Sequence, residues 1–216
     1  MFTLYTYFRS SAAYRVRIAL ILKGLDYHSV PVHLVRDGGQ QHQAQYLARN
    51  PQGLVPALAL EDGTTLTQSL AIMEYLEETC PQPALLPADA AGRARVRAIA
   101  QAVACDIHPL NNLRVLQYLQ QELKVGDAEK TAWYRHWISE GLKGVEALLR
   151  SHPATGTFCH GDSPTLADCC LVPQVFNAAR FGCPLDDFPT VRRIVEHCNT
   201  LPAFELAAPG RQEDAE

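Results

Sequence analysis

The sequence lacks several features that would each define a class of protein. No run of about 18 apolar residues is present, so we expect no membrane span. The first residues show no basic region followed by an apolar core, which argues against a signal peptide and for a cytoplasmic protein. No Cys-x-x-Cys or His-Glu-x-x-His motif occurs, so no metal site is predicted. With a net charge of −4, nucleic acid is not an expected partner.

The composition that remains is that of an ordinary globular protein. Hydrophobic residues make up 47% of the 216 residues and charged residues 19%. This length allows one large domain or two modest ones. The seven cysteines are odd in number and irregular in spacing, which indicates free thiols in a reducing compartment.

The first 80 residues mix strand and helix patterns. Strands are predicted over 2–7 and 27–32, with a helix over 11–23 between them, which favours a parallel pair joined by a crossover. A short helix over 40–48 follows. Asp62-Gly63 then indicates a hairpin, and a helix over 70–78 begins after Ser69, its expected N-cap.

Three prolines in the segment 80–88 predict a linker, and everything after it looks helical. A small α/β domain over 1–83 is therefore expected before an all-helical domain over 88–216 that contributes the substrate pocket. Thr165 and Asp168 have the spacing of a capping box. The polar tail over 208–216 is expected to be frayed. The predicted helices of the second domain span 92–123, 128–150, 165–181 and 190–199.

Ser10 and Ser11 lie where the first helix begins, with arginines on either side. The N–H groups and positive dipole end of a helix favour negative charge, and a hydroxyl there can donate to an anion. The pair therefore predicts a site for a thiolate, carboxylate or phosphate. The alternative is a helix cap alone, with Arg17 a surface charge.

Two further pairs in this half are candidates for ligand contacts. Val55 precedes Pro56, and a strand tolerates this proline if the Val55–Pro56 peptide bond is cis and the strand edge faces a ligand. The backbone N–H and C=O of Val55 would then pair with a peptide-like ligand. The alternative is an ordinary edge-strand proline. Gln68 and Ser69 form a second polar helix start, whose alternative is again a cap.

The second half contains an unusually polar helical stretch around Pro109. A proline inside a helix frees a carbonyl and kinks the axis, so His108, Asn112 and Arg114 are candidates for a site. A lone histidine is more often structural, but the cluster of polar residues favours function.

These motifs resemble those of zeta-class glutathione transferases, a family that includes maleylacetoacetate and maleylpyruvate isomerases. The similarity covers nearly the whole chain, in order. It is carried by the serine–arginine segment 10–20 and by 50–51, 55–56, 68–72, 85–87, 108–114 and 165–175. One departure stands at Ala12, where the family signature usually has a cysteine, so no protein thiol acts there. Tyr14 stands where the family usually has tryptophan.

The resemblance implies a thioredoxin-like N-terminal domain, an all-helical C-terminal domain, a homodimer and glutathione as cofactor. Ser11 would donate to the glutathione sulfur, with Ser10 beside it. The remaining glutathione contacts it implies are Gln41, Val55, Gln68, Ser69, His108 and Asn112; on the substrate side it implies His108 and Arg114, with Arg9, Arg15 and Arg180 as candidates for carboxylate binding.

The implied activity is a glutathione-dependent cis–trans isomerisation of a dianionic maleyl compound. The segment 37–43 resembles the maleylacetoacetate branch, and His108 and Arg114 resemble the maleylpyruvate branch. We favour maleylacetoacetate, in tyrosine or phenylalanine breakdown. A transferase that conjugates electrophiles such as α-halo acids is an alternative, as is a non-catalytic binding module, although the intact Ser11, Val55-Pro56 and Gln68-Ser69 argue against the latter.

Overall fold

The computed structural model describes all residues from 1 to 216 and divides into two compact units. The first unit contains residues 1–85 together with 200–216, and the second contains residues 86–199. The expected helical domain extended to residue 216, whereas here the segment 200–216 belongs with the N-terminal unit.

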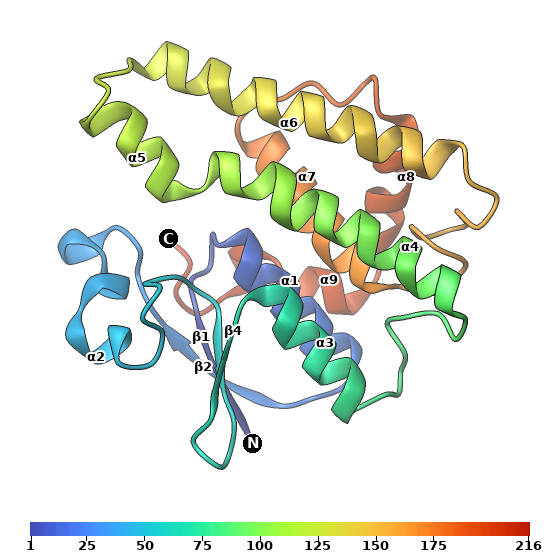
Figure 1. The fold of residues 1–216 in the computed structure, drawn as a ribbon, viewed down its shortest axis with the longest axis horizontal. Helices are drawn as coiled ribbons and strands as arrows, with labels where there is room; N and C mark the ends of the chain where they lie inside the picture. The colour runs from blue at the N-terminus through green and yellow to red at the C-terminus, as the bar shows by residue number, and fades with distance from the viewer. The chain divides into compact units, whose positions relative to one another are not determined.

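A four-stranded sheet forms the centre of the first unit (Figure 1). Its strands lie in the order β2-β1-β3-β4, with β1 parallel to β2 and β3 antiparallel to both β1 and β4. The predicted parallel pair and hairpin are therefore confirmed. The strand bounds are Phe2–Thr6 for β1, Tyr27–Pro31 for β2, Ala57–Ala59 for β3 and Thr65–Thr67 for β4.

The register of the strands brings four connections to one edge of this sheet. Thr6 at the end of β1 pairs with Pro31 at the end of β2. Ala57 at the start of β3 pairs with Tyr5 on one side and with Thr67, the end of β4, on the other. The chain segments that follow β1, β2 and β4 therefore begin at this edge, and the segment that precedes β3 ends there.

The helices of the first unit follow the predicted order with changes at their starts. The expected helix over 40–48 is split into a 3₁₀ turn, Gln40–His42, and a short helix. The expectation that Ser69 caps its helix is wrong, because Gln68 is the N-cap residue and its side chain makes no capping bond. The helix bounds are Ser11–Leu22 for α1, Ala44–Leu47 for α2, Ser69–Thr79 for α3 and Pro202–Ala207 for α9.

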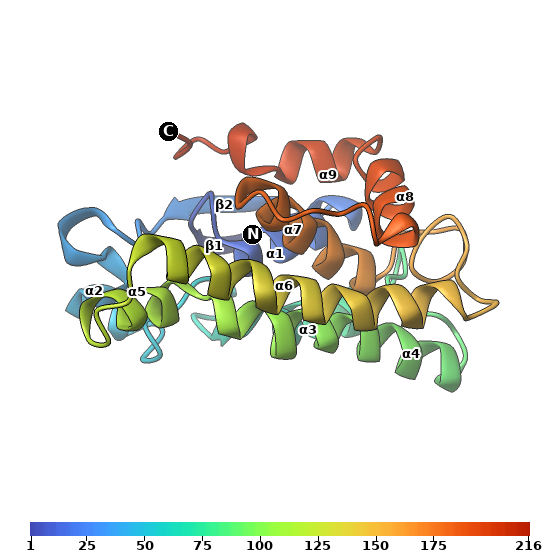
Figure 2. The ribbon, with the colours of Figure 1, turned by 90° about the horizontal axis from the view of Figure 1, so that it is seen from above.

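Helix α9 packs beside α1, as both views show (Figures 1 and 2). The side chain of Arg17 connects α1 to α9. It is fully buried, so the alternative that Arg17 is a surface charge is wrong. Its guanidinium donates to the carbonyl of Ala207 at 3.0 Å and to that of Phe8 at 3.1 Å. Further donation goes to Thr6 Oγ1 at 3.0 Å, and burial lowers the pKa of Arg17 to about 10.

The tail after α9 is not frayed. A 3₁₀ turn covers Pro209–Arg211, and Asp214 accepts a hydrogen bond from the backbone N–H of Phe8 at 3.0 Å. Residues 200–216 are therefore a structural part of the first unit.

The second unit is all-helical, as the sequence predicted. The long helix α6 runs along α5 and the segments that precede it (Figure 2). At the start of α7 the predicted capping box is present, with Thr165 and Asp168 bonded reciprocally. The α-helices are α4 (Ala90–Gln101), α5 (Leu113–Gln121), α6 (Asp127–Arg150), α7 (Leu166–Arg180) and α8 (Pro189–Cys198).

The single helix expected over 92–123 is interrupted. A π-helical segment, Ala102–Ile107, and a 3₁₀ turn, His108–Asn111, separate α4 from α5. Pro109 stops the regular helix, because its ring leaves no N–H to donate. Gly141 of α6 admits the wide π turn, since a Cβ on Gly141 would lie 2.2 Å from Cγ1 of Ile107.

No helix of the chain is long and apolar enough to cross a membrane, and no group of three or more potential metal ligands is found. All seven cysteines are free.

Candidate functional site

The junction of β1 and α1 gives Ser10 and Ser11 different roles. Ser10 is the N-cap residue, and its hydroxyl oxygen accepts from the N–H of Ala13 at 3.2 Å. Ser11 is the first helical residue and is buried. The capping alternative therefore accounts for Ser10 but not for Ser11.

The first turn of α1 contains no acidic side chain. Among its leading N–H groups, that of Ala13 is capped by the side chain of Ser10. The partial positive charge at this end is therefore not neutralised by the helix itself, and an anion is favoured there.

Arg15 connects this helix start to the start of α3. Its guanidinium is buried and donates to the hydroxyl oxygen of Ser69 at 3.1 Å. This bond holds Ser69 in place and brings a positive charge to the two helix starts. Gln68 precedes it with a φ of 68°, and its side-chain amide donates to Oε1 of Gln52 at 2.9 Å.

The segment before β3 is held by two residues that sequence reasoning did not select. The carbonyl of Leu54 accepts from the hydroxyl of Tyr46 at 2.6 Å and from the amide of Asn50 at 2.7 Å. The Val55–Pro56 bond that follows is cis. Pro56 does not belong to an edge strand, because β3 lies between β1 and β4. In the sequence, Asn50 was noted only within the segment 50–51 that carries part of the family resemblance.

Gln41 lies in the connection that follows β2. Its side-chain amide donates to the carbonyl of Leu34 at 3.2 Å, whereas its Oε1 is buried and has no partner in the chain. Gly39 permits this placement, because a Cβ there would lie 2.6 Å from Nε2 of Gln41. A buried acceptor without a partner is energetically unfavourable, so a donor from a ligand would be stabilising here.

An apolar cluster packs these connections together. It contains Tyr7 and Phe8 from the β1–α1 connection, Val32 after β2, Tyr46 of α2 and Val55 before β3. Arg9 follows Phe8, is exposed, and lies with its guanidinium 4.7 Å from the centre of the Phe8 ring. The connections from one sheet edge, and the helix starts that follow them, thus carry the candidates of the first unit: Ser10, Ser11, Arg15, Gln41, Val55, Gln68 and Ser69.

The remaining candidates lie in the second unit. Asn112 is the N-cap of α5, and its Oδ1 accepts from the N–H of Arg114 at 3.2 Å. His108 is half-buried and Arg114 is exposed. Trp133 of α6 fixes this turn, because its indole N–H donates to the carbonyl of Leu110 at 2.8 Å.

Tyr134 of α6 contacts both the 108–112 turn and Phe181, the residue next to Arg180. Its carbonyl accepts from the amide of Asn111 at 3.4 Å, and its ring stacks on Phe181 with centroids 3.7 Å apart. The exposed guanidinium of Arg180 lies over Phe181 at 4.9 Å. Arg180 and the 108–112 turn therefore both pack against one turn of α6. Burial raises the pKa of the Tyr134 hydroxyl.

The mixed sheet with its cis-proline, the open start of α1 and the separate all-helical unit are the architecture of a glutathione transferase. Residues 9–79 match the family model described as the N-terminal domain of glutathione S-transferase.

Comparisons over the whole chain give a narrower class. A probable maleylacetoacetate isomerase of Vibrio cholerae is 53% identical over 98% of this chain and 97% of its own. A solved structure of a maleylpyruvate isomerase, described as a bacterial zeta-class glutathione S-transferase, has a TM-score of 0.95 and 48% identity over 99% of this chain and 100% of its own. A maleylacetoacetate isomerase from Methylobacterium extorquens, with bound malonate and glutathione, has a TM-score of 0.95 and 44% identity over 99% of each chain. The chain belongs to the zeta-class glutathione transferases, and the expected family is confirmed.

Proposed function

We propose that the protein is a glutathione-dependent cis–trans isomerase that converts maleylacetoacetate to fumarylacetoacetate. The observation that carries this proposal is the start of α1, where a buried hydroxyl, Ser11, meets helix N–H groups with no acidic residue in the first turn. The names and ligands of the relatives support the same cofactor and substrate class.

The residues of the first unit fit glutathione. Gln41 offers a buried oxygen without a partner, which suits an N–H donor. Val55 lies beside the cis bond, outside the paired part of β3, where its backbone groups suit a peptide-like ligand. Gln68 and Ser69 at the start of α3 suit the γ-glutamyl end, as the family resemblance implies, and Arg15 supports Ser69.

Bound glutathione would supply a thiolate for addition to the cis double bond of a maleyl compound; the bond is then single and can rotate, and loss of the thiolate restores the double bond in the trans form. A free thiol has a pKa of about 8.5. Ser11 donates a hydrogen bond to the sulfur, and the start of α1 stabilises its negative charge, so both lower the pKa of the thiol. Ala12 contributes no thiol, and none is needed because the nucleophile belongs to the cofactor.

The substrate is a dianion, and the candidates that bind its carboxylates are cationic. Arg114 and Arg180 of the second unit are exposed, as is Arg9 of the first. A guanidinium suits a carboxylate because it donates in a fixed planar fork. We assign His108 and Asn112 to the boundary between glutathione and substrate, as the family resemblance implies.

Maleylpyruvate is the second candidate substrate, because a solved relative carries that name. The deciding experiment is steady-state isomerisation of both compounds, each with and without glutathione. A glutathione-dependent rate with clearly higher kcat/KM for maleylacetoacetate supports the proposal. A higher kcat/KM for maleylpyruvate would instead identify maleylpyruvate as the substrate. No rate with either compound, in a protein that binds glutathione, would leave a conjugating transferase or a binding module.

Arg114→Ala tests the assignment of the carboxylate side. Loss of one charged contact should raise KM for the dianionic substrate about tenfold. KM for a neutral chlorinated acceptor should change little, because that acceptor has no carboxylate. Equal changes for the two substrates would remove Arg114 from carboxylate binding.

We further propose a homodimer in the cytoplasm. The free state of all seven cysteines supports a reducing compartment, and the family resemblance supports the dimer. Light scattering of the purified protein measures the mass, and a mass near the 23.9 kDa of one chain would exclude the dimer.

A further inference from the structure

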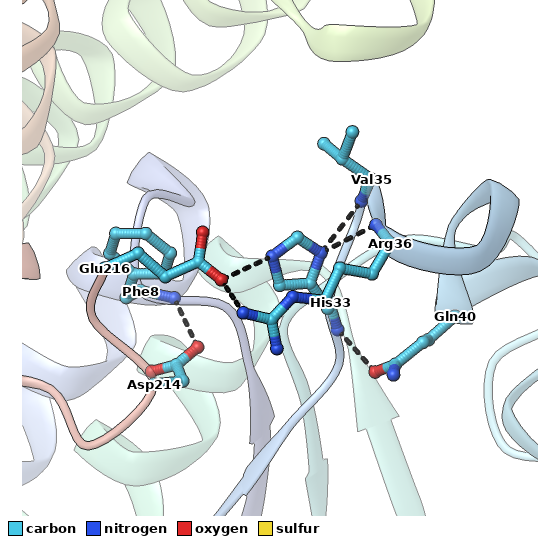
Figure 3. Close-up of polar contacts among 7 residues, drawn as sticks. All are labelled: Phe8, His33, Val35, Arg36, Gln40, Asp214 and Glu216. Carbon is cyan, nitrogen blue, oxygen red and sulfur yellow. Dashed lines mark hydrogen bonds and ion pairs between the residues drawn. The ribbon is translucent and has the colours of Figure 1, made fainter.

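Residues 212–216 contact two of the connections that carry the proposed glutathione contacts (Figure 3). One contact is to the β1–α1 connection and the other is to the connection that follows β2. Both lie within the first unit.

The first contact fixes the peptide group that leads into the helix start. Asp214 Oδ2 accepts from the N–H of Phe8 at 3.0 Å. The carbonyl of Phe8 accepts from Arg17 at 3.1 Å. Phe8 is therefore held on both its donor and its acceptor side, two residues before Ser10 and three before Ser11.

The second contact lies beside His33, and His33 organises the connection that carries Gln41. Nδ1 of His33 accepts from the N–H of Arg36 at 2.8 Å and from that of Val35 at 3.2 Å. Because Nδ1 accepts, the ring hydrogen is on Nε2. That atom lies 3.5 Å from Oε1 of Glu216.

Glu216 also pairs with the guanidinium of Arg36. The carboxylate thus binds the side chain of Arg36 next to the ring of His33, at the turn that His33 itself stabilises. The backbone of His33 is paired with Gln40 in both directions, since its N–H donates to Gln40 Oε1 and its carbonyl accepts from the N–H of Gln40, each at 2.8 Å. Gln41 is the next residue.

We propose that Asp214 and Glu216 are positioning residues for glutathione. Asp214 sets the place of the Ser10–Ser11 helix start, and Glu216 holds the turn that presents Gln41. Neither carboxylate needs to touch the ligand. This inference rests on the proposed function, because it assumes that Ser11 and Gln41 contact glutathione.

The test is glutathione affinity, measured by titration calorimetry on the whole chain and independent of isomerisation. Asp214→Ala removes the acceptor of the Phe8 N–H and should weaken binding about tenfold. Asp214→Asn keeps a side-chain oxygen at this position and should restore most of the affinity. Glu213→Ala is the matched control, since Glu213 is an exposed acidic neighbour with no described partner, and it should bind as the parent does.

The Glu216 contact is tested separately, because its side chain is 41% exposed and its removal does not threaten folding. Glu216→Ala should weaken glutathione binding severalfold. Arg36→Ala removes the ion pair but leaves the carboxylate beside His33, so it should weaken binding no more than Glu216→Ala does, and the double variant should be no weaker than Glu216→Ala.

Amide hydrogen exchange shows whether positioning is the cause. In Asp214→Ala the amide of Phe8 should exchange faster, and saturating glutathione should slow it again. Unchanged affinity in both Asp214→Ala and Glu216→Ala would overturn the inference. A parent protein that binds no glutathione would instead overturn the proposed function.

Discussion

Two α-helices of this chain have a hydroxyl residue at the N-cap, Ser10 of α1 and Thr165 of α7, and they use their first turns in opposite ways. At the start of α7, Asp168 accepts from the N–H and the hydroxyl of Thr165 at 2.8 and 2.7 Å, and from the N–H of Cys159 at 2.8 Å. At the start of α1, Ser10 accepts from one N–H only, and no acidic residue follows.

We call the start of α7 closed, because an acidic side chain of the chain itself occupies it, and the start of α1 open, because it has none. Asp168 is a built-in anion, fully buried, and burial raises the pKa of its carboxyl while the hydrogen bonds oppose that rise. It uses the positive end of α7 for stability. The start of α1 lacks such a group, so the same electrostatic property remains available for a ligand.

Removing the built-in anion should give the largest effect. Asp168→Ala leaves three buried donors without an acceptor and should lower the free energy of unfolding by about 4 kcal/mol. Urea unfolding measures this loss. Asp168→Asn keeps one acceptor and should lose clearly less. A loss below about 1 kcal/mol would show that the closed start contributes little.

Ser11→Ala tests the open start. Loss of the donor to the sulfur should lower kcat about 100-fold, with the free energy of unfolding changed by no more than about 1 kcal/mol. Ser10→Ala is the comparison variant, because it removes the cap at a cost of about 1 kcal/mol in stability and should lower kcat less. Turnover near that of the parent in Ser11→Ala would refute the role of Ser11.

Ala12→Asp converts the open start toward the closed one. A carboxylate in the first turn should raise the pKa of the bound thiol by about one unit and lower kcat/KM about tenfold at neutral pH. Added salt should reduce the effect because the new charge is partly exposed. Ala12→Asn, equal in size and uncharged, should stay close to the parent. Equal effects of the two variants would point to size rather than charge.

Local patterns predicted most of this fold. The Asp62-Gly63 turn gave the hairpin, and the Thr165–Asp168 spacing gave the capping box, because each depends on residues close in sequence. The zeta-class resemblance depended on such short segments in order, and the comparisons confirm it.

What sequence reasoning missed depends on distant residues or on backbone geometry. Arg17 is buried because its partners include the carbonyl of Ala207, 190 residues away. Ser69 is not a cap because the positive φ of Gln68 turns the chain first. The break in the helix after α4 needs Gly141 on a separate helix. For the site, Tyr46 carries no sequence signal, since only the fold brings its hydroxyl to Leu54.

The discontinuity of the first unit has a consequence for how the protein is made. Synthesis proceeds from the N-terminus, and domains generally fold as they emerge. Residues 86–199 are available as a whole before residues 200–216 exist. The Nε–H of Arg17 cannot bond its acceptor, the carbonyl of Ala207, until that residue leaves the ribosome. The helical unit can therefore complete its fold first, and the unit that begins the chain is the second to finish.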